Sequence, residues 1–123
     1  MSEVPVLDQS VLSELQETTG DDPDFVRDLV ETYLGDVPLQ LNGIDEAIAA
    51  NDAEALVRPA HTLKSSSVTL GALRLGEVSR TLEMAGRSGT LDATARESAA
   101  TAHAEWANVQ QAIDAWLAEQ AKQ

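Results

Sequence analysis

The sequence predicts an all-α protein, an antiparallel four-helix bundle with an extra short N-terminal helix. Two observations lead to this prediction. Apolar residues recur at spacings of three and four, and no segment alternates apolar and polar residues for long. The connections between the predicted helices are short, which favours antiparallel neighbours. Because 123 residues are enough for one core, we expect a single domain over residues 1–123.

Aspartates mark the starts of the first two helices. Asp8 can cap a short helix that Gly20 ends, and Asp22 can cap a second, longer one. We expect Gly35 and Pro38 to bend or break the second helix, after which the same periodicity resumes. Its apolar stripe is predicted to begin with Phe25, Val26, Leu29, Val30, Tyr33 and Leu34.

Three further helices follow from the same pattern. The third runs from about residue 53 to 70 and contains Pro59, which we expect to kink it. Gly71 separates it from a fourth helix, which residues 86–89 should end. The last helix, over about residues 92–120, completes the bundle, and one side of it presents Ala102, Trp106, Val109, Ile113, Trp116 and Leu117.

The composition excludes several classes of function. Asp and Glu number 21 against eight Lys and Arg, a formal charge of −13, so we expect neither nucleic acid nor a membrane surface as a partner. No apolar run approaches the roughly 20 residues that span a bilayer. Residues 1–8 lack a secretory signal pattern, and the chain has no cysteine. These features predict a cytoplasmic protein.

Common catalytic motifs are absent from the sequence. It contains no Gly-rich phosphate loop, no GxSxG elbow and no HExxH pair. Neither His61 nor His103 has a second ligand at metal-binding spacing, so no metal site is predicted. We therefore expect no enzyme with a nucleotide site of its own. His103 is interpreted as a structural or solvated residue.

His61 is predicted to face water. At about 100° per residue, Leu56, Leu63 and Leu70 lie about 140–180° from it around the third helix. Those leucines belong to the buried stripe, so the histidine points away from the core. The residues that share its side of the helix, at spacings of three, four and seven, are Val57, Lys64, Ser65 and Val68.

This grouping has a chemical use. A neutral imidazole, with an ordinary pKa of about 6.5, is a nucleophile that can hold a phosphoryl group through an N–P bond. Lys64 can reach the phosphoryl oxygens, and Ser65 can add a hydroxyl donor. The alternatives are a merely solvated histidine and serines that serve only as small packing residues between close helices.

The segment Ala60-His61-Thr62-Leu63-Lys64-Ser65-Ser66-Ser67, with Leu70-Gly71-Ala72 and Leu82-Glu83 after it, resembles the signature of histidine-containing phosphotransfer (HPt) domains. The resemblance covers about residues 8–90 and is weakest in the final helix. It implies a four-helix bundle that accepts a phosphoryl group from the aspartyl phosphate of a receiver domain and passes it to another receiver. One departure is Ser65, since many members have glycine there.

The resemblance also implies roles for individual residues. His61 would carry the phosphoryl group and Lys64 would stabilise it. Glu83 matches a position whose side chain can orient the imidazole, although a plain surface carboxylate is an equal alternative. Arg87 can approach the phosphoryl site or the receiver, or can be an ordinary arginine at the end of a helix. Partner-binding residues are expected to be Val57, Ser65, Val68 and Arg87.

The resemblance further implies a carrier that binds no cofactor and relies on Mg²⁺ supplied by the partner receiver. Its partners would be receiver domains and a hybrid sensor histidine kinase, and we expect a monomer. Two other functions remain open from the sequence. One is a non-catalytic helical adaptor that binds a receiver without phosphotransfer. The other is a dimerisation segment of a histidine kinase, which would need an adjoining ATP-binding domain.

Overall fold

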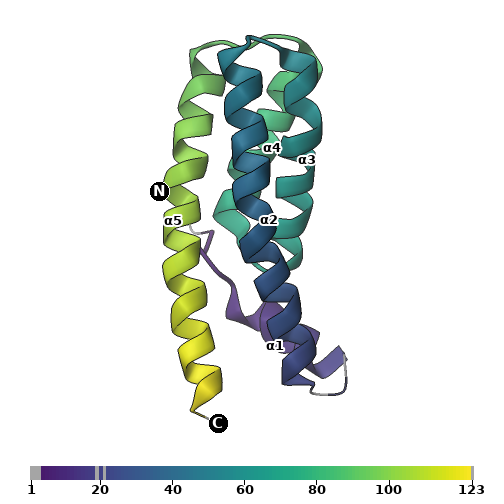
Figure 1. The fold of residues 1–123 in the computed structure, drawn as a ribbon, viewed down its shortest axis with the longest axis vertical. Helices are drawn as coiled ribbons and strands as arrows, with labels where there is room; N and C mark the ends of the chain where they lie inside the picture. Colours follow the sequence, from purple (N-terminus) through teal and green to yellow (C-terminus); the bar gives the residue numbers. More distant parts are fainter. Residues whose placement is uncertain (1–3, 19, 21, 123) are drawn as a thin grey trace.

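The protein is described by a computed structural model that covers residues 4–18, 20 and 22–122. Within these residues the chain forms five helices and no strand. Helices α2 to α5 lie side by side as an antiparallel bundle, and α1 lies at one end of it (Figure 1). The predicted fold class is confirmed. The helices are α1 (Gln9–Thr18), α2 (Pro23–Ala49), α3 (Ala53–Thr69), α4 (Leu73–Ser88) and α5 (Ala93–Ala121).

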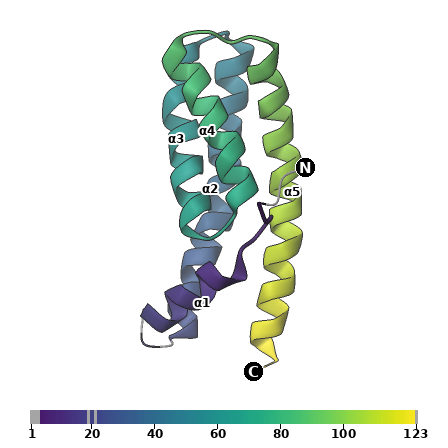
Figure 2. The same cartoon turned by 180° about the vertical axis from the view of Figure 1, so that it is seen from behind.

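The four bundle helices differ in length. Helices α2 and α5 have 27 and 29 residues, whereas α3 and α4 have 17 and 16. Helix α1 lies beyond the α3–α4 connection, next to the parts of α2 and α5 that extend past it (Figure 2). Asp8 N donates to Gly71 O at 2.8 Å, and Gln16 Nε2 donates to Gln120 Oε1 at 3.2 Å. Helix α1 therefore covers the end of the short hairpin.

Four helices begin at aspartates. The carboxylates of Asp8, Asp22, Asp52 and Asp92 each accept an N–H from the residue two or three positions later, at 3.0–3.3 Å. Each of these bonds satisfies a backbone donor that has no partner inside the helix. The predicted caps at Asp8 and Asp22 are confirmed.

The prolines do not end their helices. We expected Gly35 and Pro38 to bend or break the second helix, and the break is wrong because α2 is continuous from Pro23 to Ala49. Pro38 lies on the exposed side, and buried apolar residues continue at helical spacing on both sides of it. Burial of that stripe outweighs one lost hydrogen bond. Pro59 likewise lies within the continuous α3.

Pro59 has a packing role that the sequence left open. A Cβ atom on Gly43 of α2 would lie 3.2 Å from the Cβ of Pro59, so the proline ring rests on a position without a side chain. Helices α2 and α3 approach each other closely at this point. The proline and the glycine therefore form one contact between the two helices.

The core lies along the axis of the bundle. Trp106 and Trp116 are 7% and 6% exposed, which confirms their place in the core. Trp106 contacts Tyr33 edge to face, with ring centroids 5.7 Å apart. Phe25 was expected in the α2 stripe but is 45% exposed, because the buried stripe runs through its neighbour Val26, which is 0% exposed. The buried residues of α2 are Val26, Val30, Tyr33, Val37, Leu41, Ile44 and Ala47.

Helices α3 and α4 pack closely because glycines line their contact. A Cβ on Gly86 would lie 2.9 Å from Ala53 O and from a methyl group of Val57. A Cβ on Gly76 would lie 2.8 Å from a methyl group of Val68. Gly86 was expected to help end the fourth helix. Instead it lies buried inside α4. The helix ends at Ser88, before Gly89, whose backbone has the left-handed conformation.

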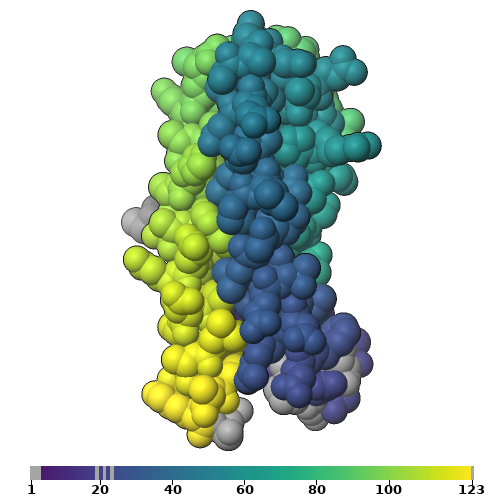
Figure 3. Space-filling view, viewed as in Figure 1, coloured from purple at the N-terminus to yellow at the C-terminus, as the bar shows by residue number. Residues whose placement is uncertain are grey.

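The surface is formed by the outer sides of these helices. In the space-filling view α2 runs down the middle of one face, between α5 and α3 (Figure 3). No helix in the described part of the chain has both the length and the apolar character needed to cross a membrane.

Candidate functional site

His61 lies in the middle of α3 and points outward, as predicted. Its side chain is 52% exposed, whereas Leu56 and Leu63 on the opposite side of the helix are 0% exposed. Leu70, the third predicted leucine of the buried stripe, is also in the core. The amphipathic pattern of α3 therefore determines the direction of the imidazole.

Glu83 holds this imidazole from the neighbouring helix. Glu83 lies on α4 with a side chain that is only 6% exposed, and its Oε2 lies 3.1 Å from His61 Nδ1. The alternative of a surface carboxylate is therefore wrong. Gly76 and Gly86, on either side of Glu83 along α4, let the two helices approach closely enough for this contact.

Two cations compensate the buried carboxylate. Lys64 Nζ lies 2.7 Å from Glu83 Oε1, and the Nε and Nη2 atoms of Arg87 donate to Glu83 Oε2 at 2.9 and 2.7 Å. The ion pair with Lys64, followed by the bonds from Arg87 and His61, lowers the pKa of Glu83 from 4.5 to about 2, although burial acts in the opposite direction. Glu83 is therefore ionised at neutral pH.

The charge on Glu83 selects one tautomer of His61. An ionised carboxylate can only accept hydrogen bonds, so the proton of a neutral imidazole must lie on Nδ1. The lone pair then lies on Nε2, the other nitrogen of the ring. A half-exposed imidazole with a free Nε2 is poised for nucleophilic attack on an incoming electrophile.

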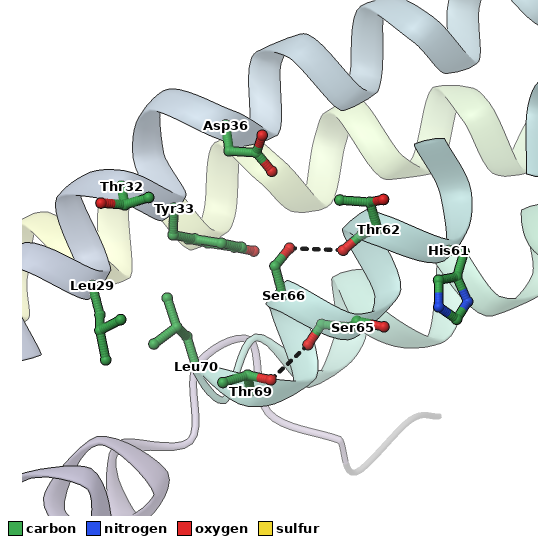
Figure 4. A pocket seen from close by; sticks show the side chains of 10 residues that line it. All are labelled: Leu29, Thr32, Tyr33, Asp36, His61, Thr62, Ser65, Ser66, Thr69 and Leu70. Atoms are coloured by element: carbon green, nitrogen blue, oxygen red, sulfur yellow. Dashed lines mark hydrogen bonds between the residues drawn. The ribbon is translucent and has the colours of Figure 1, made fainter. Parts of the chain in front are cut away.

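A groove runs between α2 and α3 beside His61 (Figure 4). Its volume is about 540 Å³. The hydroxyl groups of Ser66 and Thr69 donate to carbonyls of their own helix at 3.0 and 2.8 Å. Their hydrogens are therefore not free to bind a group in the groove. The groove is lined by Leu29, Thr32, Tyr33, Asp36, His61, Thr62, Ser65, Ser66, Thr69 and Leu70.

The serine triplet divides between two roles. Ser67 is fully buried, and its hydroxyl lies 2.8 Å from the hydroxyl of Tyr33. Burial raises the pKa of Tyr33 to about 12, and the bond to Ser67 opposes this shift. Ser65 is exposed and lines the groove next to His61. Of these two serines, only Ser67 packs between helices, as the alternative interpretation expected of the serines.

The other predicted partner-binding residues differ in how far their side chains are exposed. Val68 is 50% exposed. Val57 is half-buried and packs over Gly86, so it offers less surface than expected. The side chain of Arg87 is 60% exposed even though it binds Glu83.

Sequence reasoning missed the wall of the groove that α2 contributes. Thr32 and Asp36 lie one turn apart on α2 and line the groove, with Asp36 across from Thr62 of α3 (Figure 4). Nothing in the local sequence distinguishes them from ordinary solvated residues. Only the packing of α2 against α3 brings them to the His61 site.

His103 lies apart from this site. It is on α5, and its Nε2 lies 2.8 Å from Asp45 Oδ2 of α2. Both side chains are about half exposed, at 49% and 47%. This pair fits the prediction of a structural or solvated histidine. Among the described residues, no group of three or more His, Asp or Glu side chains is arranged to hold a metal ion.

The fold and the site together define a helical bundle that presents a histidine oriented by a buried carboxylate. Residues 28–119 match the model of the Hpt domain family, and this chain belongs to that family. It is therefore a histidine phosphotransfer protein of phosphorelays, a carrier and not a classical enzyme. Members of the family interact with receiver domains and kinases.

A solved structure supports the assignment. The chain is similar to histidine-containing phosphotransfer protein B (HptB) from Pseudomonas aeruginosa PAO1, with a TM-score of 0.81 and 31% sequence identity. The match covers 91% of this chain and 94% of that chain. No curated protein sequence matches the chain.

Proposed function

We propose that His61 is the residue that carries the phosphoryl group, taking it from the aspartyl phosphate of one receiver domain and passing it to another. The observation that carries this proposal is the bond from His61 Nδ1 to the buried, ionised Glu83, on a ring whose other nitrogen is free. The other histidine, His103, has only an exposed carboxylate as its partner.

The first step is an attack by His61 Nε2 on the phosphorus of the aspartyl phosphate. The N–P bond forms as the P–O bond to the aspartate breaks, and the aspartate leaves as a carboxylate. Nδ1 keeps its proton, so the phosphorylated ring gains a positive charge that Glu83 stabilises at 3.1 Å. Transfer to a second receiver reverses the same steps.

The phosphoryl group needs positive charge around its oxygens. Lys64 is the predicted cation, and its Nζ is bound to Glu83 at 2.7 Å in the structure. The long lysine side chain can turn toward the phosphoryl group, and Arg87 then still compensates Glu83. In this proposal the chain itself binds no cofactor, and the remaining charge would be neutralised by Mg²⁺ held by the partner receiver.

We also propose the partners of this protein and its location in the cell. The donor would be the receiver domain of a hybrid sensor histidine kinase, and the acceptor a second receiver. Phosphoryl groups in such a relay derive from ATP, which supports a cytoplasmic location. We also propose a monomer, since Glu83, Lys64 and Arg87 of the same chain suffice to orient His61 and to compensate the charge of Glu83.

The test is to mix the protein with a phosphorylated receiver domain and Mg²⁺ and to map the label by mass spectrometry. We expect an acid-labile, base-stable phosphoryl group on His61. His61→Gln should remove the label, and the matched variant His103→Gln should keep it. If a panel of receivers bound the protein but never labelled it, the chain would be a non-catalytic adaptor.

A further inference from the structure

The charges of this protein are divided unevenly between two parts of the chain. Residues 53–88, which form α3 and α4, contain five of the eight Lys and Arg residues but only three of the 21 Asp and Glu residues. Their formal charge is +2, and the rest of the chain has a formal charge of −15. The helices that carry His61 and Glu83 are thus the positive part of a strongly acidic molecule.

Part of this positive charge lies on the outer side of α4, next to the His61 site. We call the surface formed by Arg80, Met84 and Arg87 the α4 edge. These residues are spaced four and three apart on the helix, so they lie on one side of it. Arg80 lines a hollow together with Lys64 and Val68, which places it beside the residues around His61.

The α4 edge has a charged group and an apolar side chain that are free to contact a partner. In the described part of the chain, the guanidinium of Arg80 has no ion-pair or hydrogen-bond partner, whereas Lys64 and Arg87 are both bound to Glu83. Met84 is 58% exposed, and Val68 is 50% exposed. An exposed apolar side chain next to a free arginine is typical of the residues that bind a partner protein.

We propose that the α4 edge binds an acidic surface of the receiver domain, next to the aspartate that exchanges its phosphoryl group with His61. This inference rests on the proposed function. Arg80 supplies the free charge, and Met84 supplies the apolar contact. The α4 edge would then set the choice of receiver, while His61 and Glu83 perform the exchange.

The charge division also orients the partner. An acidic receiver is repelled by the part of the molecule with a charge of −15 and is attracted only to α3 and α4. Electrostatic steering of this kind acts on the association rate and weakens as salt screens the charges.

The test compares two variants with the same change in net charge. Arg80→Glu reverses the charge on the α4 edge. Arg96→Glu makes the same reversal on an exposed position of α5, outside the positive part. Phosphotransfer to each variant is measured by rapid quench, with a phosphorylated receiver that labels the wild-type protein, at low and at high salt.

We expect Arg80→Glu to slow transfer about tenfold at low salt and Arg96→Glu to slow it less than about twofold. The difference should shrink to about threefold or less at about 0.3 M salt. Arg80→Gln should have an intermediate effect. Thermal unfolding of each variant, followed by circular dichroism, checks that the fold is kept.

Equal rates for Arg80→Glu and Arg96→Glu would overturn the inference, and the proposed function would stand because the wild-type protein is labelled. If no receiver labels the wild-type protein, the proposed function fails. In that case, binding of the same variants to an unphosphorylated receiver is measured by calorimetry. Weaker binding of Arg80→Glu, but not of Arg96→Glu, would support the inference. Equal binding of the two variants would reject it.

Discussion

The two histidines of this protein are both exposed on helices and both contact a carboxylate, but their surroundings differ. His61 contacts Glu83, which is 6% exposed and is also bound by Lys64 and Arg87. His103 contacts Asp45, which is 47% exposed. Exposed ion pairs are screened by water and hold their side chains weakly. A buried, compensated carboxylate has a fixed position and a fixed charge.

Under the proposed function, this difference is what would make His61, and not His103, the reactive histidine. Glu83 can hold the proton on Nδ1 of His61 because two cations keep it ionised, with its pKa lowered to about 2. Asp45 and His103 form a contact of similar length without the buried surroundings. The proposed chemistry therefore depends on the burial of the partner carboxylate and not on the histidine alone.

The largest expected effect concerns the pH dependence of stability. Because the pKa of Glu83 falls from 4.5 to about 2 on folding, its contribution is fully present above pH 4.5 and is lost as the pH falls toward 2. The shift corresponds to at most about 3 kcal/mol. Chemical denaturation of the wild-type protein and of Glu83→Gln between these pH values should show this loss only in the wild type. Parallel curves would contradict the assigned charge state.

The second effect concerns the distance between α3 and α4. Gly86→Ala would place a methyl group 2.9 Å from the carbonyl oxygen of Ala53, so we expect a loss of about 2 kcal/mol in the free energy of unfolding and slower labelling of His61. Gly35→Ala in α2 meets no atom within 4 Å and should instead stabilise the protein by about 0.5 kcal/mol. Urea denaturation measures both. Equal stabilities would show that close packing of α4 on α3 is unimportant.

The third effect concerns the lifetime of the phosphorylated protein. Lys64→Gln removes the cation that is proposed to bind the phosphoryl group but leaves Arg87 on Glu83, so we expect the half-life of phosphohistidine to fall about fivefold. Lys122→Gln, at the end of α5, removes the same charge from a surface pair with Glu119 and should leave the half-life unchanged. The decay of the label, followed by mass spectrometry, measures both. An unchanged half-life in Lys64→Gln would exclude this role.

The smallest effect is expected at the other histidine. Asp45→Asn breaks the contact with His103, and we expect a change in unfolding free energy of less than about 0.5 kcal/mol with no change in phosphotransfer. A large loss of unfolding free energy or of phosphotransfer in Asp45→Asn would contradict this expectation. It would mean that the contact of His103 with Asp45 matters as much as that of His61 with Glu83.

Much of the site was predictable from sequence because it depends on one helix. The outward direction of His61 and the positions of Lys64 and Ser65 around it follow from helical periodicity. The resemblance to HPt domains added Glu83, but it left open whether that carboxylate was buried. Phe25 was placed wrongly in the buried stripe because a short apolar run does not reveal which neighbours a helix will have. Pro38 was expected to bend or break α2 because only its lost hydrogen bond was considered, and not the burial of the apolar residues on both sides of it.

The sequence by itself determined the helical class of the fold, the starts of two helices at Asp8 and Asp22, and the direction of His61, because these depend on periodicity and capping within a few turns. Only the tertiary structure decided that Glu83 is buried against His61 and that Pro59 rests on Gly43. These contacts join residues 16 to 22 positions apart on different helices, and their distances depend on how closely those helices pack.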